Sequence, residues 1–552
     1  MEIKAGLDFG TTTSIFSYMD RGKIEKFTYG GETDLGTTYV PSLVAYGEDF
    51  IQIGHYARDL SSAKASLYKY FKMLLPEDDK NNWSEEYGPY LRESRTPAEV
   101  ATDYIGELIK GASPYRTSLG GDEVNLDAFE PYHRKEIDGL IVSVPHVWHD
   151  VKATGRSRLQ EVIRSLGLPL IGLISEPIAA AAFFAYRYHK NNGASYKGNL
   201  LVCDMGGGTF DVALCRMLPG RVEVLLNEGN GEKGLGIAGA HFDIKLIEQK
   251  LGDKFKTLDS RQISELLISL DTQKKSSNAK AKLINCILYP DDNDARINEV
   301  YEVASKSAQR FLGFRYEEIV KAFDCVRDGI HSVLNRVKTA AVASEYPIDK
   351  VVMVGGFSKF PLVQRAIEEA FADKVVNQKH GGFVDDVTLN SDSMAYAISF
   401  GACLVANQDV QVSERYEHTI GINAYSRQQR RDIRIELIKA GEPLDSLSAP
   451  RFCQKDGGEN RQFEIDPNKE TVSPEMFIVP NNRGESEIKT RVQLREIPNR
   501  NLSRNSWMIG ARVDSSKVPY LVIRDVLKGV MKEYPLALLP EIWEVDETTT
   551  SK

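Results

Sequence analysis

The chain has 552 residues, 42% of them hydrophobic and 27% charged, which is long enough for several domains and ordinary for a soluble globular protein. A formal net charge of −9 argues against a general binder of nucleic acid or anionic membranes, and no apolar run is long enough to span a bilayer. Six cysteines without a CxxC pair, and no basic-then-apolar opening segment, lead us to expect the reducing cytoplasm or nucleus.

A glycine turn near the N-terminus is the first functional signal. Residues Gly6–Ser14 contain the pattern Asp-x-Gly-x-x-Thr, which begins at Asp8, and a strand-like run follows. Strand-like runs on both sides of a glycine turn predict a β-hairpin. The same pattern returns at Asp204–Thr209, which predicts two related lobes that each offer one phosphate loop to a shared ligand site.

Two charged residues of the first half each allow two interpretations. Lys72 lies in the apolar run Lys69–Leu75, either as a surface lysine whose stem covers its neighbours or as a cation aimed at phosphate oxygens. Glu176 lies where the short strand Leu170–Ile174 meets an alanine-rich helix. It is either a partner of the helix dipole or an acid that orients a water molecule.

Strands and helices alternate through the rest of the first half. Thr96–Glu99 is a capping box with proline at the first helical position, so a helix is expected to begin there. Ile137–Pro145 is expected to form a buried strand, and Asp150–Leu166 a helix that stops at Gly167. This alternation predicts an α/β architecture.

The glycine-rich stretch Asp204–Asp211 is the central feature of the expected second lobe. Its three adjacent glycines carry no Cβ atom, so a phosphate chain can approach their N–H groups closely. A carboxylate at each end suits hydrated Mg²⁺. A bare triple glycine would favour a flexible turn, but the matching pattern at Asp8 favours a phosphate loop.

Helices and one buried strand follow the glycine-rich stretch. The region from about Phe242 to Ser277 is helix-dominated, and its charge run Asp271–Lys275 is by default a solvated helix face. Tyr316–Ala343 carries one apolar stripe and predicts a long amphipathic helix. Val351–Val354 predicts a buried strand, and the two glycines after it form a crevice edge where a flat ring can lie against backbone.

Five segments, taken in order, resemble the phosphate-1, connect-1, phosphate-2, adenosine and connect-2 motifs of the actin-like ATPase superfold. They are Asp8–Ser14, Ile174–Ala182, Asp204–Asp211, Val354–Pro361 and Tyr396–Ala402. Within them, Ser175–Ala181 and Asp204–Asp211 resemble the heat shock protein 70 family. The resemblance covers roughly residues 1–406. It implies an α/β fold in which a duplicated ribonuclease H-like core makes two lobes, 1–190 and 191–406.

The resemblance also implies ATP or ADP and Mg²⁺ as cofactors, and it assigns roles to residues. Asp8 and Asp204 would hold Mg²⁺ through water, and Lys72 would stabilise charge on the transferring phosphoryl group. Glu176 would position the attacking water, with Asp211 assisting nearby. The residues that would surround the nucleotide are Gly10, Thr11, Thr12, Gly206, Gly207, Gly208, Thr209, Gly239, Lys274, Lys275, Gly355, Gly356 and Ser358.

Residues 407–552 depart from the family pattern. Asn407–Val412 lacks the acidic, leucine-rich linker of the family, and the connect-2 motif has Ala395 and Tyr396 where an acidic pair is usual. The pairing of Tyr416–Ile422 with Leu437–Gly441 is similar to the divergent type-12 heat-shock-70-like subfamily and its fungal relatives. We therefore expect a short β-rich region without a full peptide-binding lid, and it is expected to end in a helix over residues 518–534.

Three functions are consistent with these observations. The first is an ATP-binding, slowly hydrolysing heat-shock-70-like chaperone whose nucleotide state controls lobe closure, with protein clients or co-chaperones as partners. The second is a nucleotide-sensing binding protein with negligible turnover. The third, a small-molecule kinase of the same superfold, is disfavoured because no acceptor-binding insert is evident. A Walker-type NTPase is excluded by the absence of G-x-x-x-x-G-K-[ST]. The oligomeric state is left open.

Overall fold

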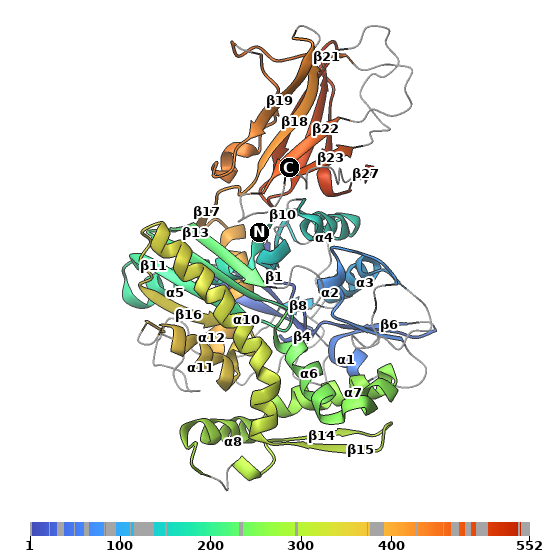
Figure 1. Ribbon diagram of the computed structural model, residues 1–552, viewed down its shortest axis with the longest axis vertical. Helices are drawn as coiled ribbons and strands as arrows, with labels where there is room; N and C mark the ends of the chain where they lie inside the picture. The colour runs from blue at the N-terminus through green and yellow to red at the C-terminus, as the bar shows by residue number, and fades with distance from the viewer. Residues whose placement is uncertain are drawn as a thin grey trace, which may run out of the picture. The chain divides into compact units, whose positions relative to one another are not determined.

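The computed structural model places the chain in two compact units, and each contains its own sheets (Figure 1). The first unit comprises residues 1–148 and 159–412, and the second comprises residues 149–158 and 413–552. The structure describes residues 3–20, 22–29, 38–48, 50–59, 66–81, 83, 95–110, 112–114, 137–148, 152–230, 236–292, 296–371, 374–375, 391–426, 429–455, 457–464, 474–480, 487–492, 506–538 and 541–542. Among these residues, no helix combines the length and the apolar character that crossing a membrane requires.

The first unit opens with a seven-stranded sheet, which with its helices we call lobe I. Its strand order is β10-β9-β1-β2-β3-β8, and β4 pairs with β2. The strands span Lys4–Asp8 (β1), Thr13–Asp20 (β2), Lys23–Tyr29 (β3), Val40–Pro41 (β4), Ala112–Pro114 (β8), Gly139–Val144 (β9) and Leu170–Ser175 (β10). Strands β1, β9 and β10 are parallel, so their carboxyl ends meet at one edge of the sheet.

A small three-stranded sheet and several helices complete lobe I. The sheet has the order β6-β5-β7. These elements span Leu43–Tyr46 (β5), Ile51–Ile53 (β6), Gly54–Asp59 (α1), Ser66–Lys69 (β7), Phe71–Leu74 (α2), Pro97–Lys110 (α3), His146–Trp148 (η4), Thr154–Ser165 (α4) and Glu176–Asn192 (α5). The first five residues of α4 belong to the second unit. The expected capping box of α3 is confirmed: the Thr96 N–H donates to Glu99 Oε2 (2.7 Å) and the Glu99 N–H to Thr96 Oγ1 (3.2 Å).

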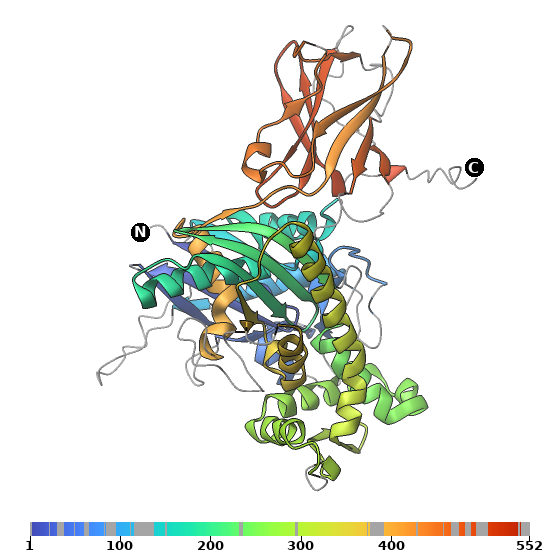
Figure 2. The same cartoon turned by 60° about the vertical axis from the view of Figure 1, so that its left-hand side comes forward.

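Lobe II is built on a five-stranded sheet of order β16-β11-β12-β13-β17. The strands span Gly198–Met205 (β11), Phe210–Leu218 (β12), Arg221–Asn230 (β13), Lys350–Val354 (β16) and Gln411–Ser413 (β17). The helices span Gly239–Leu251 (α6), Gly252–Thr257 (η5), Ser260–Lys275 (α7), Ser277–Leu288 (α8), Tyr316–Ala343 (α10), Phe357–Lys359 (η6), Pro361–Phe371 (α11) and Ser391–Ala406 (α12). The long helix α10, with its buried stripe, extends from the sheet to the hairpin of β14 (Tyr301–Ser305) and β15 (Arg310–Phe314) (Figure 2).

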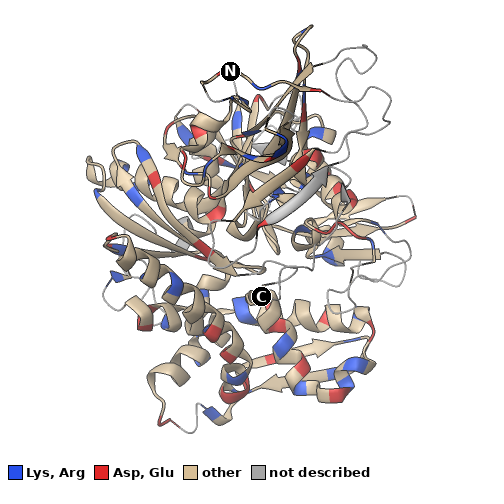
Figure 3. Ribbon diagram, turned by 45° about the horizontal axis from the view of Figure 1, so that its top comes forward, with Lys and Arg blue, Asp and Glu red and all other residues tan. Residues whose placement is uncertain are grey.

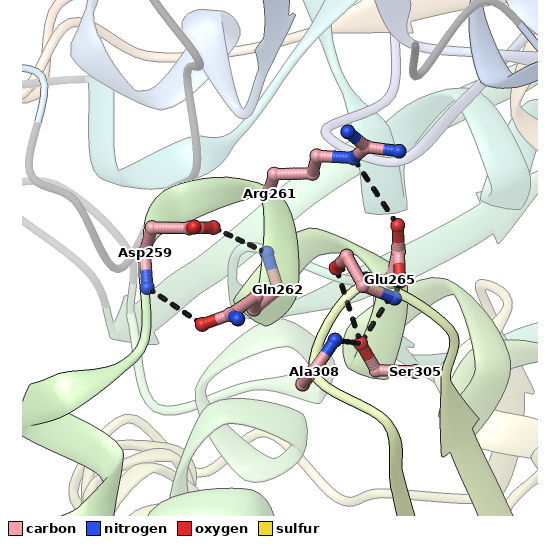
Figure 4. A network of polar contacts seen from close by, with 7 residues as sticks. Asp259, Arg261, Gln262, Glu265, Ser305 and Ala308 are labelled. Carbon is pink, nitrogen blue, oxygen red and sulfur yellow. Dashed lines mark hydrogen bonds and ion pairs between the residues drawn. The ribbon is translucent and has the colours of Figure 1, made fainter. Parts of the chain in front are cut away.

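A polar network fastens this hairpin to helix α7 (Figure 4). Asp259 caps α7 through a capping box with Gln262, whose N–H lies 2.8 Å from Asp259 Oδ1. One turn later, Glu265 Oε2 accepts hydrogen bonds of 2.9 Å from the Ser305 hydroxyl and from the Ser307 N–H. The other oxygen, Oε1, lies 3.3 Å from Arg261 Nε. One carboxylate therefore holds the end of β14 against α7.

Two helices tie the lobes together because each packs on both sheets. Helix α5 follows β10 of lobe I and packs on β11, β12 and β13 of lobe II. Helix α12 belongs to lobe II by chain order and packs on β1, β2 and β9 of lobe I. The two helices also contact each other, and their backbones nearly touch: a Cβ atom on Gly401 would lie 1.7 Å from the Ala179 carbonyl oxygen. The α/β, two-lobed architecture expected from the sequence is confirmed.

The second unit is a pair of β-sheets that share one core. Its sheets have the orders β19-β18-β22-β23-β27 and β20-β24-β25-β26, with β21 paired to β24. The strands span Thr419–Ser426 (β18), Arg431–Ile438 (β19), Arg451–Phe452 (β20), Phe463–Glu464 (β21), Glu475–Val479 (β22), Ile488–Val492 (β23), Ser506–Val513 (β24), Pro519–Asp525 (β25), Met531–Pro535 (β26) and Glu541–Ile542 (β27). Ile420 and Met476 from one sheet pack with Trp507 and Leu521 from the other.

The helix expected over Val518–Tyr534 is wrong, because strands β25 and β26 occupy this segment. Apolar residues at positions 518, 522, 526 and 530 have helical spacing, but the first five residues of β25 are all buried. A strand buried on both faces loses its alternation and cannot be told from a helix by periodicity alone. The Asp525 side chain makes the turn, since it accepts hydrogen bonds from the Leu527 and Lys528 N–H groups (3.1 and 3.0 Å).

Candidate functional site

The two Asp-x-Gly-x-x-Thr segments lie against each other. The first is the turn between β1 and β2, and the second is the turn between β11 and β12. A Cβ atom on Gly207 would lie 2.4 Å from Thr12 Cγ2, and one on Gly208 would lie 2.5 Å from Thr11 Oγ1. Because any side chain would clash there, glycine is required for this approach. The backbone of one loop therefore faces the hydroxyl groups of the other.

Four buried carboxylates gather beside these loops. Asp8 and Glu176 lie at the carboxyl ends of the parallel strands β1 and β10, and Asp204 and Asp211 are opposite each other in the β11–β12 pair. The Ser143 hydroxyl donates to Asp8 Oδ1 (2.9 Å). In the part of the chain that the structure describes, Asp204 Oδ2 has no hydrogen-bond partner.

Burial and mutual repulsion perturb this cluster strongly. Burial, followed by the charge of Glu176, raises the pKa of Asp8 to about 7 and that of Asp211 to about 7. The same causes, with Asp211 and Asp8 as further neighbours, raise the pKa of Asp204 well above its ordinary value. Since Asp8 acts on Asp204, the two lobes bring these carboxylates within electrostatic reach of each other. The cluster carries more negative charge than its own protein partners neutralise.

The side chain of Lys72 extends into this carboxylate cluster. It lies in the short helix α2, which Tyr70 precedes with a left-handed backbone (φ +60°). Its side chain is 2% exposed, and its Nζ pairs with Glu176 Oε1. The rings of Phe9 and Trp148 lie 5.7 and 5.9 Å from Nζ. The amine lowers the pKa of Asp8, Asp204 and Asp211 in part, but it does not cancel their repulsion.

Two predicted glycines of lobe II border the phosphate loop. Gly355 has a φ of +87°, and a Cβ atom there would lie 2.3 Å from Asp204 Oδ1. Gly239 begins helix α6, and its N–H donates to the Gly206 carbonyl (3.2 Å). Gly356 differs, because a Cβ atom there would meet nothing within 4 Å. Helix α6 thus starts on the loop, and open space lies beside the second glycine after β16.

Of the remaining predicted residues, Lys274 lies near the site, Lys275 lies on the outer face of its helix, and Ser358 is buried. Lys274 Nζ lies 2.6 Å from Asp243 Oδ1 and 5.1 Å from the centre of the Phe357 ring, so it belongs to the same neighbourhood. Lys275 is 66% exposed and pairs with Asp271 (2.7 Å) on the outer face of α7. Lys and Arg (blue) are interspersed with Asp and Glu (red) on the helices in the lower part of Figure 3. Ser358 is fully buried, and its hydroxyl donates to the Val354 carbonyl.

Sequence reasoning missed an aromatic cluster beside Lys274. Phe357 and Phe360 stack with ring centres 5.0 Å apart, and Phe242 lies 5.6 Å from Phe357. Asp243, which pairs with Lys274, was also missed. Phe357 and Phe360, which follow the Gly355-Gly356 pair in the sequence, could have indicated this cluster, but single aromatic residues in a loop are ordinarily interpreted as core residues.

A directly bound metal is not indicated among the described residues, where no group of three or more His, Cys, Asp and Glu side chains could hold one. A hydrated cation is a better fit, because Mg²⁺ keeps several waters and uses few protein carboxylates. The unpartnered oxygen of Asp204 and the surplus negative charge around it suit such an ion.

Comparison with known proteins gives a consistent result. A family model described as "Hsp70 protein" matches residues 4–380. The chaperone protein DnaK of Thermotoga neapolitana is 27% identical over 446 residues, which are 76% of this chain and 63% of that protein. A chaperone protein dnaK from Cyanidium caldarium is 26% identical over 390 residues, or 67% of this chain and 57% of that protein. The chain spans less than two thirds of the length of these relatives. Since the family model covers well over half of the chain and includes both phosphate-loop segments, the chain belongs to the Hsp70 family.

Proposed function

We propose that this chain binds ATP and ADP together with Mg²⁺ between lobes I and II, and that it hydrolyses ATP slowly. The observation that carries the proposal is the facing pair of Asp-x-Gly-x-x-Thr turns, with buried carboxylates and a buried lysine beside them. Phosphoryl transfer needs positioning and charge neutralisation more than covalent chemistry, and these groups supply both.

Each group has a role that its surroundings support. Asp8 and Asp204 would hold Mg²⁺ through water, and the ion would neutralise charge on the phosphates. Lys72, which is buried and held by Glu176, would stabilise the charge that develops during transfer. Glu176 would orient the attacking water as the lysine turns to the phosphate, with Asp211 close by.

The nucleotide would lie along the loops and extend toward helix α7. Thr11, Thr12 and the backbone of residues 206–209 would surround the phosphates, because they already face one another. The adenosine would lie near Gly239, Gly356 and Lys274, where the space beside Gly356 and the ring of Phe357 suit a flat base. Lys275 and Ser358 would act at most indirectly, since one pairs on the outer face and the other is bonded to Val354.

We further propose that nucleotide binding closes the two lobes and that the change serves a chaperone function on protein clients or co-chaperones. The packing of α5 and α12 on both sheets supports a hinge of this kind, because each of these helices contacts both lobes. The two-sheet second unit would then provide the surface that meets partners.

The proposal is tested by binding and turnover in the full chain. We expect ATP and ADP to bind in the presence of Mg²⁺ and ATP to be hydrolysed slowly, with stimulation by unfolded peptides. Asp8→Asn should weaken Mg²⁺-dependent binding, whereas Asp253→Asn removes one exposed charge and should change nothing. Absence of binding to both nucleotides would refute the proposal. Tight ATP binding with no turnover would instead identify a nucleotide sensor.

A further inference from the structure

Lys69 is a buried amine that the roles above leave unused. It is the last residue of β7, it is 5% exposed, and its register partner is Leu43 of β5. Among the residues that the structure describes, its Nζ has no hydrogen-bond partner; the Tyr70 ring lies 5.5 Å away. Burying an ammonium group without a partner is costly, so such a residue calls for an explanation.

The neighbours of Lys69 along the chain and across the lobes connect it with the phosphate loops. It precedes Lys72 by three residues, and Lys72 reaches the carboxylate cluster. Across the lobes, the charged group that acts on Lys69 is Asp243 of helix α6. That helix begins on the second phosphate loop, since the Gly239 and Ala240 N–H groups donate to the Gly206 and Gly207 carbonyls. Lys69 therefore precedes the short helix that carries Lys72, and it interacts electrostatically with a helix that begins on the second phosphate loop.

The charges around Lys69 leave room for an anion. Both carboxylate oxygens of Asp243 already contact the Lys274 amine of α7 (2.6 and 2.7 Å), so Lys274 largely neutralises the charge of Asp243. Arg58 of α1 also lies 3.9 Å from Asp271 of α7 across the lobes, and because Asp271 is paired with Lys275 as well, this group carries no surplus negative charge. A further negative charge would be stabilised by Lys69, and a nucleoside polyphosphate is such a ligand.

We infer that Lys69 is a second cation of the nucleotide site, which lobe I presents to the polyphosphate beside Asp243 of lobe II. The inference rests on the proposed function and adds a residue to it. Burial, which Asp243 only partly offsets, lowers the pKa of Lys69 to about 7. Lys69 is therefore mostly neutral at pH 8 and takes up a proton when the polyphosphate arrives.

The test compares ligands with and without phosphate, using the full chain. Lys69→Met should weaken ADP and pyrophosphate binding by about tenfold to a hundredfold, the scale of one charged hydrogen bond, and leave adenosine binding unchanged. Lys110→Met is the matched control, since that lysine of lobe I is 71% exposed. Equal losses for ADP and adenosine, or no loss, would overturn the inference. Binding of pyrophosphate alone would identify a site for free polyphosphate and contradict the nucleotide assignment.

Proton uptake separates a phosphate contact from a merely structural role. Calorimetry of Mg²⁺–ADP binding at pH 8, in buffers of different ionisation enthalpy, measures protons exchanged. Asp8, Asp204, Asp211 and Asp243 also have raised pKa values, so the decisive quantity is the difference between the natural chain and each variant. We expect additional uptake in the natural chain that is lost in both Lys69→Met and Lys69→Arg, while Lys69→Arg retains affinity.

Two failures can be told apart in this design. If the natural chain binds no nucleotide, the proposed function and the inference both fall. If the natural chain binds ADP and both variants have the same proton exchange and affinity as the natural chain, only the role of Lys69 is refuted.

A thermal unfolding measurement on each variant completes the test. Lys69→Met is expected to unfold no earlier than the natural chain, because it removes a buried amine. A large loss of stability would indicate a structural role.

Discussion

Replacing Lys72 with alanine tests the core of the proposed chemistry. The amine is 2% exposed and is the cation paired with Glu176 inside the carboxylate cluster. Removing one preorganised charge-stabilising group from a buried site costs about 2–4 kcal/mol of transition-state stabilisation. That corresponds to a fall of roughly 30-fold to 1,000-fold in the rate of the chemical step.

The assay must isolate that step from binding and from folding. Single-turnover hydrolysis of ATP already bound to the full chain reports it directly. Losing Lys72 also leaves Glu176 unpaired, and breaking a buried pair costs about 3–5 kcal/mol of stability. Thermal unfolding and ADP binding of the variant therefore accompany the rate, and Lys72→Met serves as a second variant that keeps the stem. Lys110→Ala is the exposed control. An unchanged single-turnover rate in a folded variant would refute the role given to Lys72.

Three further changes test the packing near the site and the polar network that holds the β14–β15 hairpin against α7. Gly401→Ala should lower the free energy of unfolding by about 1–3 kcal/mol, because its Cβ would lie 1.7 Å from the Ala179 carbonyl oxygen of α5. Gly329→Ala in α10 should be neutral or stabilising, because its Cβ would have its nearest neighbour, Asn230 Nδ2, at 3.3 Å. Equal unfolding temperatures of the two variants would contradict this expectation. Gly355→Ala should weaken Mg²⁺–ADP binding by displacing Asp204, whereas Gly220→Ala, also at positive φ but in open space, should not; binding titrations decide. Burial opposes ionisation of Glu265, but the hydrogen bonds from the Ser307 N–H and the serine hydroxyls outweigh it and lower its pKa. Glu265 therefore adds stability above its ordinary pKa of 4.5 that is lost as the pH falls below it, so Glu265→Gln should unfold earlier than the natural chain at pH 7 and the gap should close in acid.

Patterns that local chemistry determines were predictable from the sequence. The capping box at Thr96 and the bounds of the helix Tyr316–Ala343 depend on neighbouring residues and on one apolar stripe, and the structure has both. The facing glycine turns were predictable for a different reason, because the same pattern occurs twice. The strands in segment 518–534 were not predictable. Its apolar residues have helical spacing, and the burial of β25 on both faces depends on the partner sheet, which the local sequence does not reveal.

Contacts between distant parts of the chain marked the limit of prediction at the site. Lys274 and Lys275 are adjacent and look equivalent in sequence, yet one turns inward to Asp243 and the other outward to Asp271. Only the position of α6 beside α7 distinguishes them. Lys69 was also not predictable as a buried residue, because a lysine at the end of a short strand is ordinarily exposed, whereas this one is 5% exposed.

The polar interior of the first unit is unbalanced in two opposite ways. Beside the phosphate loops, carboxylates that include Asp8 and Asp204 repel one another and lack a sufficient cation. Beside Asp243, the amine of Lys69 lacks an anion of its own. A metal ion alone would relieve the first imbalance and a phosphate alone the second, but a Mg²⁺–nucleotide complex relieves both at once. Because a ligand that binds only the folded state stabilises it, such a complex should raise the unfolding temperature of the first unit more than Mg²⁺ and ADP do separately.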